Sequence, residues 1–322
     1  MLRILQSIFS KGPTSGKYPE SLVKAAIERA VDGTDPWIRA VSGYKRLLRP
    51  AIVQSIDFVV SLIDSIVPPI EINSDSYDND SQLRSYFISH ADMRRALFSD
   101  QNIANIRRVR ELAPSRQVVA LLVMEKQEKI IYGSELSGSI VLHDVPLMSI
   151  SFENYRLIDL SISENEVRHQ LKRRAFDHLL SIALRQIIAV KAERNKLERY
   201  RTLLQSKSNL LRCGGWGFNN NSGEPIDVPG IEALLVQIES DLLQLGGDDS
   251  MLENYLNVVV DVLGHPAEHI WLKREVLIRD HMGIKRREAT NGAEKTTLQV
   301  ISNDECRSLV VLLIAIADDV LT

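Results

Sequence analysis

Cysteine is scarce in this sequence: two residues, Cys213 and Cys306, occur in a chain of 322. They form no C-x-x-C pair, which excludes a disulfide framework and a sulfur-based zinc knuckle. A chain of this length with 44% hydrophobic residues can form a core without such cross-links. Because unpaired thiols are typical of a reducing compartment, we expect a cytoplasmic protein.

Long hydrophobic runs are missing as well. The longest, from Leu309 to Ala317, has nine residues, whereas a helix that crosses a bilayer needs about 20. The opening residues "MLRILQSIFSKG" lack the apolar core and cleavage site of a secretory signal, and their apolar residues fit one side of a short helix. We therefore expect no transmembrane segment, and we expect 309–317 to be buried.

Motifs of catalysis are equally rare, and we predict no catalytic residue and no cofactor. The pentapeptide "HPAEH" has the H-x-x-E-H order of some zinc peptidases, with His265, Glu268 and His269 as candidate ligands. That motif requires a continuous helix. Here Gly264 ends the preceding apolar segment and Pro266 disfavours a helical conformation of His265. We reject the zinc site and predict a turn from helix to strand.

The first 116 residues carry helical signals. Pro19 stands near one expected helix start, and Asp35 with Pro36 supplies a cap and a first helical residue for another. Apolar residues then recur at three- and four-residue spacing until Pro68, while Pro50 is expected to break the chain. Residues 1–116 are predicted to form an N-terminal helical region.

From residue 117 the hydrophobic period changes to that of strands. Residues 117–157 contain four short runs of branched residues, which predict an antiparallel meander with breaks at "EKQ", at "SG" and at Val145-Pro146. A second meander is predicted over 270–317, with a turn at Met282-Gly283. Because neither set alternates with helices, the predicted class is α+β, with 117–160 and 265–322 as the β region. Whether the two sets share one sheet stays open.

A single long helix is predicted between the strand sets, over 164–212. Ser163 and Glu166 form a capping box, and no proline or glycine follows before Gly214. One apolar position recurs every seven residues to Leu211, but its companion position turns polar after about residue 190. We expect residues 191–212 to project with one narrow seam, which either closes an intramolecular hairpin or joins an intermolecular coiled coil.

The charge of this helix is strongly positive. Residues 167–212 hold twelve lysines and arginines against three acids, a net charge of +9, whereas residues 213–272 hold ten acids and no lysine or arginine. Two acidic helices are readable over about 229–264, which makes 161–264 an inserted helical hairpin. If they fold back on the basic helix, much of its charge is neutralised. If they do not, it can contact phosphates; the candidate residues are Lys191, Arg194, Lys196, Arg199, Arg201 and Lys207.

These features favour a cytoplasmic interaction or scaffolding protein. A projecting amphipathic helix without active-site motifs presents surface to a protein partner or to a second copy of the chain. The predicted partner contacts are the polar and apolar residues of the projecting part and the two aromatic residues at its tip: Arg194, Leu197, Arg201, Leu204, Trp216 and Phe218. Nucleic-acid binding through 167–212 is the first alternative, and an enzyme whose site the sequence does not reveal is the second.

Overall fold

The computed structural model describes residues 18–73, 75–112, 117–137, 140–212, 228–246, 250–280, 282–286 and 293–317. The short helix expected at the N-terminus lies outside these ranges. The chain folds into two compact units. One takes the residues up to Ile56 together with Phe176–His265, and the other takes Asp57–Ala175 together with Pro266–Thr322.

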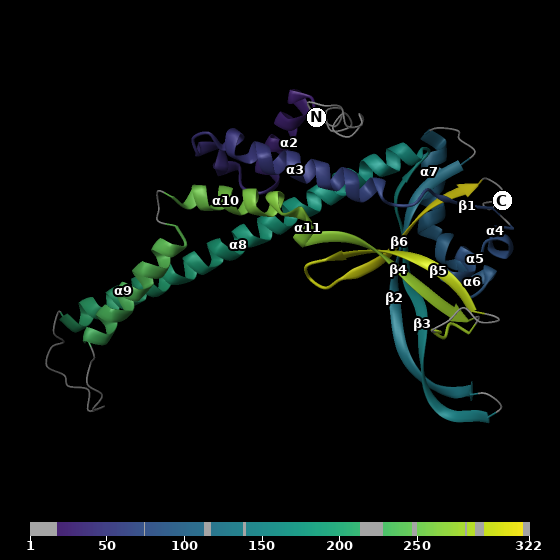
Figure 1. Ribbon diagram of the computed structural model, residues 1–322. Coiled ribbons are helices and arrows are strands. Elements are labelled where there is room, and N and C mark those ends of the chain that lie inside the picture. Colours follow the sequence, from purple (N-terminus) through teal and green to yellow (C-terminus); the bar gives the residue numbers. More distant parts are fainter. Residues whose placement is uncertain are drawn as a thin grey trace. The chain divides into compact units, whose positions relative to one another are not determined.

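One antiparallel sheet organises the second unit, in the order β3-β2-β6-β5-β4 (Figure 1). Its strands are β2 (Gln117–Ser137), β3 (Ile140–Ser161), β4 (Ile270–Asp280), β5 (Ala293–Asn303) and β6 (Ser308–Ala317). A short strand, β1 (Ile70–Ile72), pairs in parallel with β6, within the region predicted as helical. The two strand sets therefore share one sheet, and the α+β class is confirmed.

The first strand set is one long hairpin, and the prediction of four short strands over 117–157 was wrong. Lys126 pairs with Phe152 and Tyr132 pairs with Pro146 inside the β2-β3 ladder. The polar residues Glu125–Gln127, which predict a turn, begin where the β2-β6 pairing ends, at Met124. They therefore mark the point where β2 continues without β6 beside it. Pro146 is tolerated because β3 is an edge strand, where a missing amide proton breaks no ladder bond.

Helices cover both faces of this sheet. Val118, Ala120 and Leu122 point into a cluster with buried residues of α5 (Ser81–Tyr86), α6 (His90–Leu97) and α7 (Asp100–Leu112). The alternate residues Val119 and Leu121 pack in a second cluster with the end of α3 and the start of α8. Burial on both faces explains why β2 begins as an unbroken apolar run.

The start of α8 (Glu164–Arg212) is fixed to the end of α3 (Tyr44–Asp64) within this unit. The Arg168 guanidinium donates to the carbonyl oxygens of Ile63 and Ile66 at 2.7 and 3.0 Å. The Lys172 ammonium lies 2.7 Å from the Asp64 carboxylate. Arg168 thus satisfies carbonyls at the C-terminal end of α3 and Lys172 pairs with a carboxylate there, at a helix end where positive charge is favourable.

The other unit is helical. It contains α2 (Glu20–Gly33), the 3-10 helix η1 (Pro36–Ala40), the first part of α3, most of α8, α9 (Val228–Gln244) and α10 (Met251–Gly264). In Figure 1, α10 and α9 follow one another along α8. The long helix ends at Arg212 after 49 residues, as the absence of glycine and proline predicts.

Pro50 lies inside α3, and the expected chain break there was wrong. The buried residues Leu48, Ile52 and Ile56 continue one apolar stripe across it. This burial outweighs the local cost of a proline in a helix, about 3 kcal/mol. The predicted helix start at Asp35 is real but brief: its carboxylate accepts from the Trp37 amide at 2.9 Å, and η1 ends five residues later.

Candidate functional site

The seam of α8 is covered by α9. Leu204 is only 6% exposed and belongs to a buried cluster with Ile231, Ile238 and Leu242, against which Leu197 also packs. Two of the predicted partner contacts, Leu197 and Leu204, are thus engaged within the chain. The narrow apolar seam closes a helical hairpin, the intramolecular arrangement that the loss of the companion apolar position suggested.

The remaining predicted partner contacts differ in their surroundings. Arg194 is buried, and its guanidinium donates to the Glu198 carboxylate at 2.8 Å and to the carbonyl oxygen of Gly246. Arg201 is half-buried. Trp216 and Phe218 lie outside the described residues, so their part in a contact stays a prediction.

The six basic candidates for phosphate contact divide into two groups. Lys191 lies 2.6 Å from the Asp35 carboxylate, Arg194 binds Glu198, and Lys196 lies 3.3 Å from Glu193. Acids outside α9 and α10 therefore hold these three cations. Arg199 and Lys207 are exposed and Arg201 is half-buried, and within the described ranges no carboxylate lies at ion-pair distance from these three.

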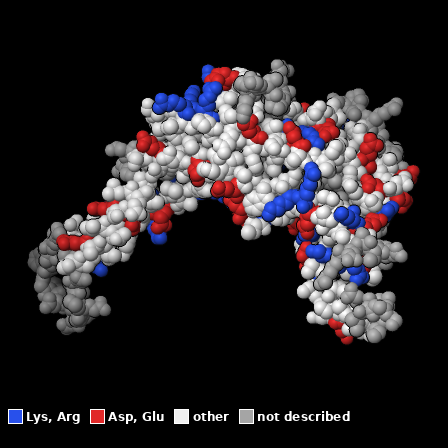
Figure 2. Space-filling model, viewed as in Figure 1, with Lys and Arg blue, Asp and Glu red and all other residues white. Residues whose placement is uncertain are grey.

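Large apolar side chains remain exposed on the outside of the α8-α9 hairpin. Leu203 and Leu210 on α8 are 63% and 75% exposed, and Val236 and Leu243 on α9 are 67% and 73% exposed. Each pair is seven residues apart, so its members share one helix face. On the face seen in Figure 2, uncharged side chains cover most of the surface over α9. We name these four residues the outer leucine-valine surface.

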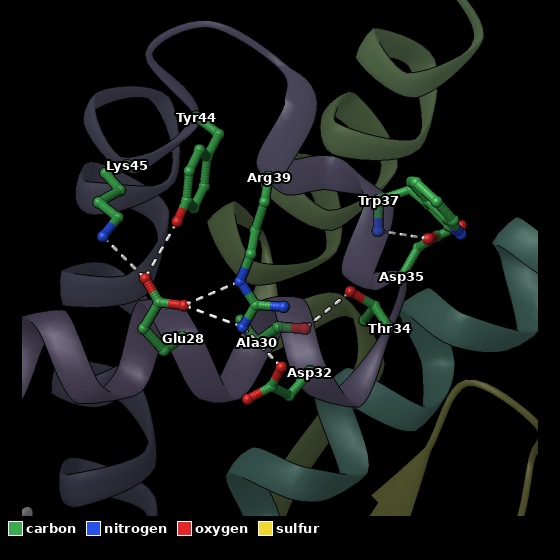
Figure 3. A network of polar contacts seen from close by, with 9 residues as sticks. All are labelled: Glu28, Ala30, Asp32, Thr34, Asp35, Trp37, Arg39, Tyr44 and Lys45. Atoms are coloured by element: carbon green, nitrogen blue, oxygen red, sulfur yellow. Dashed lines mark hydrogen bonds and ion pairs between the residues drawn. The ribbon is translucent and has the colours of Figure 1, made fainter.

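A polar network joins α2, η1 and α3 on the surface of the helical unit (Figure 3). The Glu28 carboxylate accepts from Lys45, Tyr44 and Arg39, at 2.9, 3.0 and 2.9 Å. The hydrogen bond from Lys45, together with those from Arg39 and Tyr44, lowers the pKa of Glu28 to about 2. Partial burial alone would raise this pKa. The network consists of satisfied ion pairs, which indicates a structural role.

The "HPAEH" segment forms a connection from helix to strand. His265 caps α10, its neighbours Pro266–His269 form the short helix α11, and β4 begins at Ile270. The His269 ring nitrogen Nδ1 lies 3.2 Å from the Asp304 carboxylate, and the His265 ring lies 3.1 Å from Asp261. Among the described residues, no group of three histidine, cysteine or acidic side chains is arranged to hold a metal ion.

A pocket that sequence reasoning missed lies in the sheet-containing unit. It has a volume of about 420 Å³ and is lined by segments far apart in the sequence, from α4 (Ser76–Asn79) and α5 to β3, the end of β4 and the start of β5. Aromatic rings form much of its wall. Phe87 stacks on Tyr155 with ring centres 5.1 Å apart, and Tyr86 meets Phe152 edge-on at 5.4 Å.

The tyrosines of this pocket are neutral hydrogen-bonding groups. Burial raises the pKa of Tyr86 to about 12 and also raises the pKa values of Tyr77 and Tyr155. The Tyr155 hydroxyl donates to the Tyr86 carbonyl at 2.7 Å, and the Tyr77 hydroxyl donates to the Ile88 carbonyl at 3.0 Å. These contacts hold the rings in place, and the phenols add no negative charge at neutral pH.

No local signal in the sequence identifies the pocket. Its lining runs from Tyr77 to Glu294, and only folding brings these residues together.

Comparison of the chain with protein-family models, with curated proteins and with solved structures gives no significant match. None of the helices in the described ranges has both the length and the apolar character needed to cross a bilayer.

Proposed function

We propose that the protein is an interaction or scaffolding protein that binds a protein partner through the outer face of its α8-α9 hairpin. The observation that carries this proposal is the outer leucine-valine surface. Leu203, Leu210, Val236 and Leu243 stay exposed although the hairpin has already closed its own seam through Leu204 and Ile238. Large apolar side chains that stay exposed on both helices of one hairpin are typical of a protein-protein contact.

The flanks of this surface suit an interface as well. Tyr200 is 45% exposed one turn before Leu203, and Leu234 is 45% exposed near Val236. Tyrosine and arginine are enriched among residues that dominate binding energy, and Arg201 lies next to Tyr200. Trp216 and Phe218 belong to the same proposal as contacts at the hairpin tip.

We place this contact in the cytoplasm as part of the proposal. The support is the cysteine content of two residues in 322, without a C-x-x-C pair. Cys306 is a free, exposed thiol. A reducing compartment keeps such a thiol from forming disulfides between molecules.

The test compares two variants of the full chain that carry equal added charge. Leu203→Asp with Leu210→Asp places two carboxylates on the proposed contact. Asn195→Asp with Asn209→Asp places two on exposed positions of α8 that are rotated away from it. Both should keep the circular dichroism spectrum of the parent, because all four residues are exposed.

The partner is first recovered by co-purification with the parent chain and then titrated in purified form. We expect the leucine variant to weaken its binding at least tenfold, an order of magnitude typical for anchor residues, and the asparagine variant to bind as the parent does. Sedimentation velocity of the same three proteins shows whether the partner is a second copy. Equal affinity of all three for the partner, with equal self-association, would exclude this surface.

Nucleic-acid binding by α8 is a second proposal, supported by Arg199 and Lys207, which are exposed and hold no carboxylate among the described residues. The logarithm of the binding constant for such a complex falls linearly with the logarithm of the salt concentration. Each phosphate contact adds nearly one unit to the slope. Arg199→Gln with Lys207→Gln should therefore reduce the slope by about 2 in fluorescence anisotropy with a DNA duplex. Lys196→Gln is the control, because Glu193 already holds that ammonium. Absence of binding at low salt would end this second proposal.

A further inference from the structure

The pocket of the sheet-containing unit contains a cation, Arg279, that forms no ion pair with a described carboxylate. The Arg279 guanidinium is half-buried and donates to the carbonyl oxygens of Ile150 and Arg84, at 3.2 and 3.1 Å. These bonds use two of its five N–H donors. Among the described residues no acid lies at ion-pair distance from it. An arginine that is partly withdrawn from water in this way is left with donors and charge to offer to an anion.

The two acids that line the same pocket are each held by another arginine. The Asp280 carboxylate lies 2.8 Å from Arg286 and accepts from the backbone amides of Met282 and Ile284, both at 3.0 Å. The Glu294 carboxylate lies 3.1 Å from Arg84. Arg286 and Arg84 thus occupy both carboxylates, and Arg279 is the pocket cation without a carboxylate at ion-pair distance in the described part of the chain.

The rest of the wall suits a flat apolar body. The guanidinium carbon of Arg279 lies 5.6 Å from the centre of the Phe152 ring, which fixes the cation at the edge of the aromatic wall. The half-buried Tyr155 and Tyr77 extend this wall, while the buried Tyr86 and Phe87 support it by packing against Phe152 and Tyr155, and Ile88 and Met282 add apolar surface. A volume of about 420 Å³ lies within the range of about 300–1,000 Å³ that is common for small-molecule sites.

We propose that this pocket binds a small organic anion, in which a carboxylate or phosphomonoester group contacts Arg279 and a planar ring lies among the aromatic side chains. Carboxylate and phosphate both match the forked donors of a guanidinium. Planar rings gain from packing against aromatic faces and edges. The proposal does not depend on the α8-α9 surface, with which the pocket shares no residue.

The ligand class is tested on the parent chain with four probes: 2-naphthoate, 2-naphthyl phosphate, the neutral 2-naphthamide and inorganic phosphate. Isothermal titration should give saturable binding of a naphthyl anion with a dissociation constant on the order of 1 mM or below. The amide, which lacks the charge, and inorganic phosphate, which lacks the ring, should each bind at least about tenfold more weakly. The tighter of the two naphthyl anions assigns the anionic group. Equal binding of amide and carboxylate, or no binding of either anion, would overturn the proposal.

The site itself is tested by substitution and by methyl spectra. Arg279→Gln should weaken binding of the better naphthyl anion at least tenfold, whereas Arg274→Gln, an exposed arginine on the same strand, should leave it unchanged. In case Arg279→Gln does not fold, the parent chain with labelled methionine methyls gives a second readout. The Met282 signal should shift on titration and the Met251 signal on α10 should not. Shifts at Met251 with none at Met282, or an unchanged affinity of a folded Arg279→Gln, would exclude the pocket.

Discussion

The Lys191 ammonium lies 2.6 Å from the carboxylate of Asp35, a residue with 3% of its surface exposed, and so joins α8 to the start of η1. The same carboxylate accepts from the Trp37 amide, and the Lys191 ammonium lies 5.0 Å from the centre of the Tyr255 ring. One aspartate thus caps a helix and neutralises a cation of the basic helix.

Replacing Asp35 by alanine removes both roles at once. The loss of the cap and of the partner of Lys191 should lower the free energy of unfolding by about 2 kcal/mol. Urea denaturation followed by circular dichroism measures this change. Asp32→Ala is the control, because Asp32 is 59% exposed and makes a surface ion pair with Arg39. An effect no larger than that of the control would contradict the role assigned to Asp35.

Neighbouring leucines on α8 offer a direct test of the hairpin seam. Leu204→Ala should destabilise the protein by about 2 to 3 kcal/mol, because it leaves a cavity in the cluster with Ile231 and Ile238. Leu203→Ala removes the same atoms from a side chain that is 63% exposed and should change stability by less than about 0.5 kcal/mol. Denaturation midpoints of the two variants give the comparison. Similar losses for both would mean that α9 does not cover the seam.

The turn after β4 requires a glycine at position 283. Gly283 has φ +79°, and an added Cβ would lie 3.2 Å from the carbonyl oxygen of Ile150. Gly283→Ala should therefore destabilise the protein by about 1 to 2 kcal/mol. Gly264→Ala serves as the control, since no atom lies within 4 Å of its added Cβ, and it should be neutral or slightly stabilising. Thermal unfolding distinguishes these outcomes, and equal melting temperatures would contradict the strain at Gly283.

The Glu28 network should make stability depend on pH. The folded pKa of about 2 lies below the ordinary value of 4.5, so the carboxylate stabilises the fold at neutral pH. That contribution decreases as the pH falls from about 5 toward 2. Glu28→Gln should cost about 1 kcal/mol at neutral pH, a small value because the side chain is 37% exposed.

The measurement compares urea midpoints of the parent and of Glu28→Gln at neutral pH and near pH 3. The difference between the two proteins should shrink at the lower pH, as the unfolded chain takes up the proton at Glu28 before the folded chain does. A difference that stays constant or grows with acid would contradict the lowered pKa.

The length of α8 is predictable from sequence, whereas the number of strands before it is not. Between Ser163 and Gly214 no residue disfavours a helix, so local propensity alone sets the bounds. In β2 the polar residues at Glu125–Gln127 resemble a turn. They are polar because the β2-β6 pairing ends at Met124, which is a tertiary fact. The break predicted at Pro50 fails for a tertiary reason as well, because the burial of Leu48 and Ile52 stabilises the helix on both sides of the proline.

The two candidate sites also differ in how far the sequence predicts them. The seven-residue repeat through Leu197 and Leu204 indicates a covered seam but not which element covers it, so the sequence also allows a partner contact there. Leu203 and Leu210 share that spacing, yet only the position of α9 shows that they remain outside. Arg279 occupies an alternate position of a strand, where a polar residue normally faces water, and no local pattern relates it to Tyr86.

The pairing of β2 divides that strand into two parts. Residues 117–124 pair with β6, and from Val119 on this part of the strand also pairs with β3, with register shifts between Val119 and Leu121 and between Val123 and Glu125, so most of its amide hydrogens face a partner strand. Beyond Met124 the strand partner that the structure describes for β2 is β3 alone, and every second amide faces away from the ladder. Deuterium uptake should therefore be slow in the first part of β2 and fast at alternate residues of the second. A single strand would report both the most protected and some of the least protected amides of the sheet.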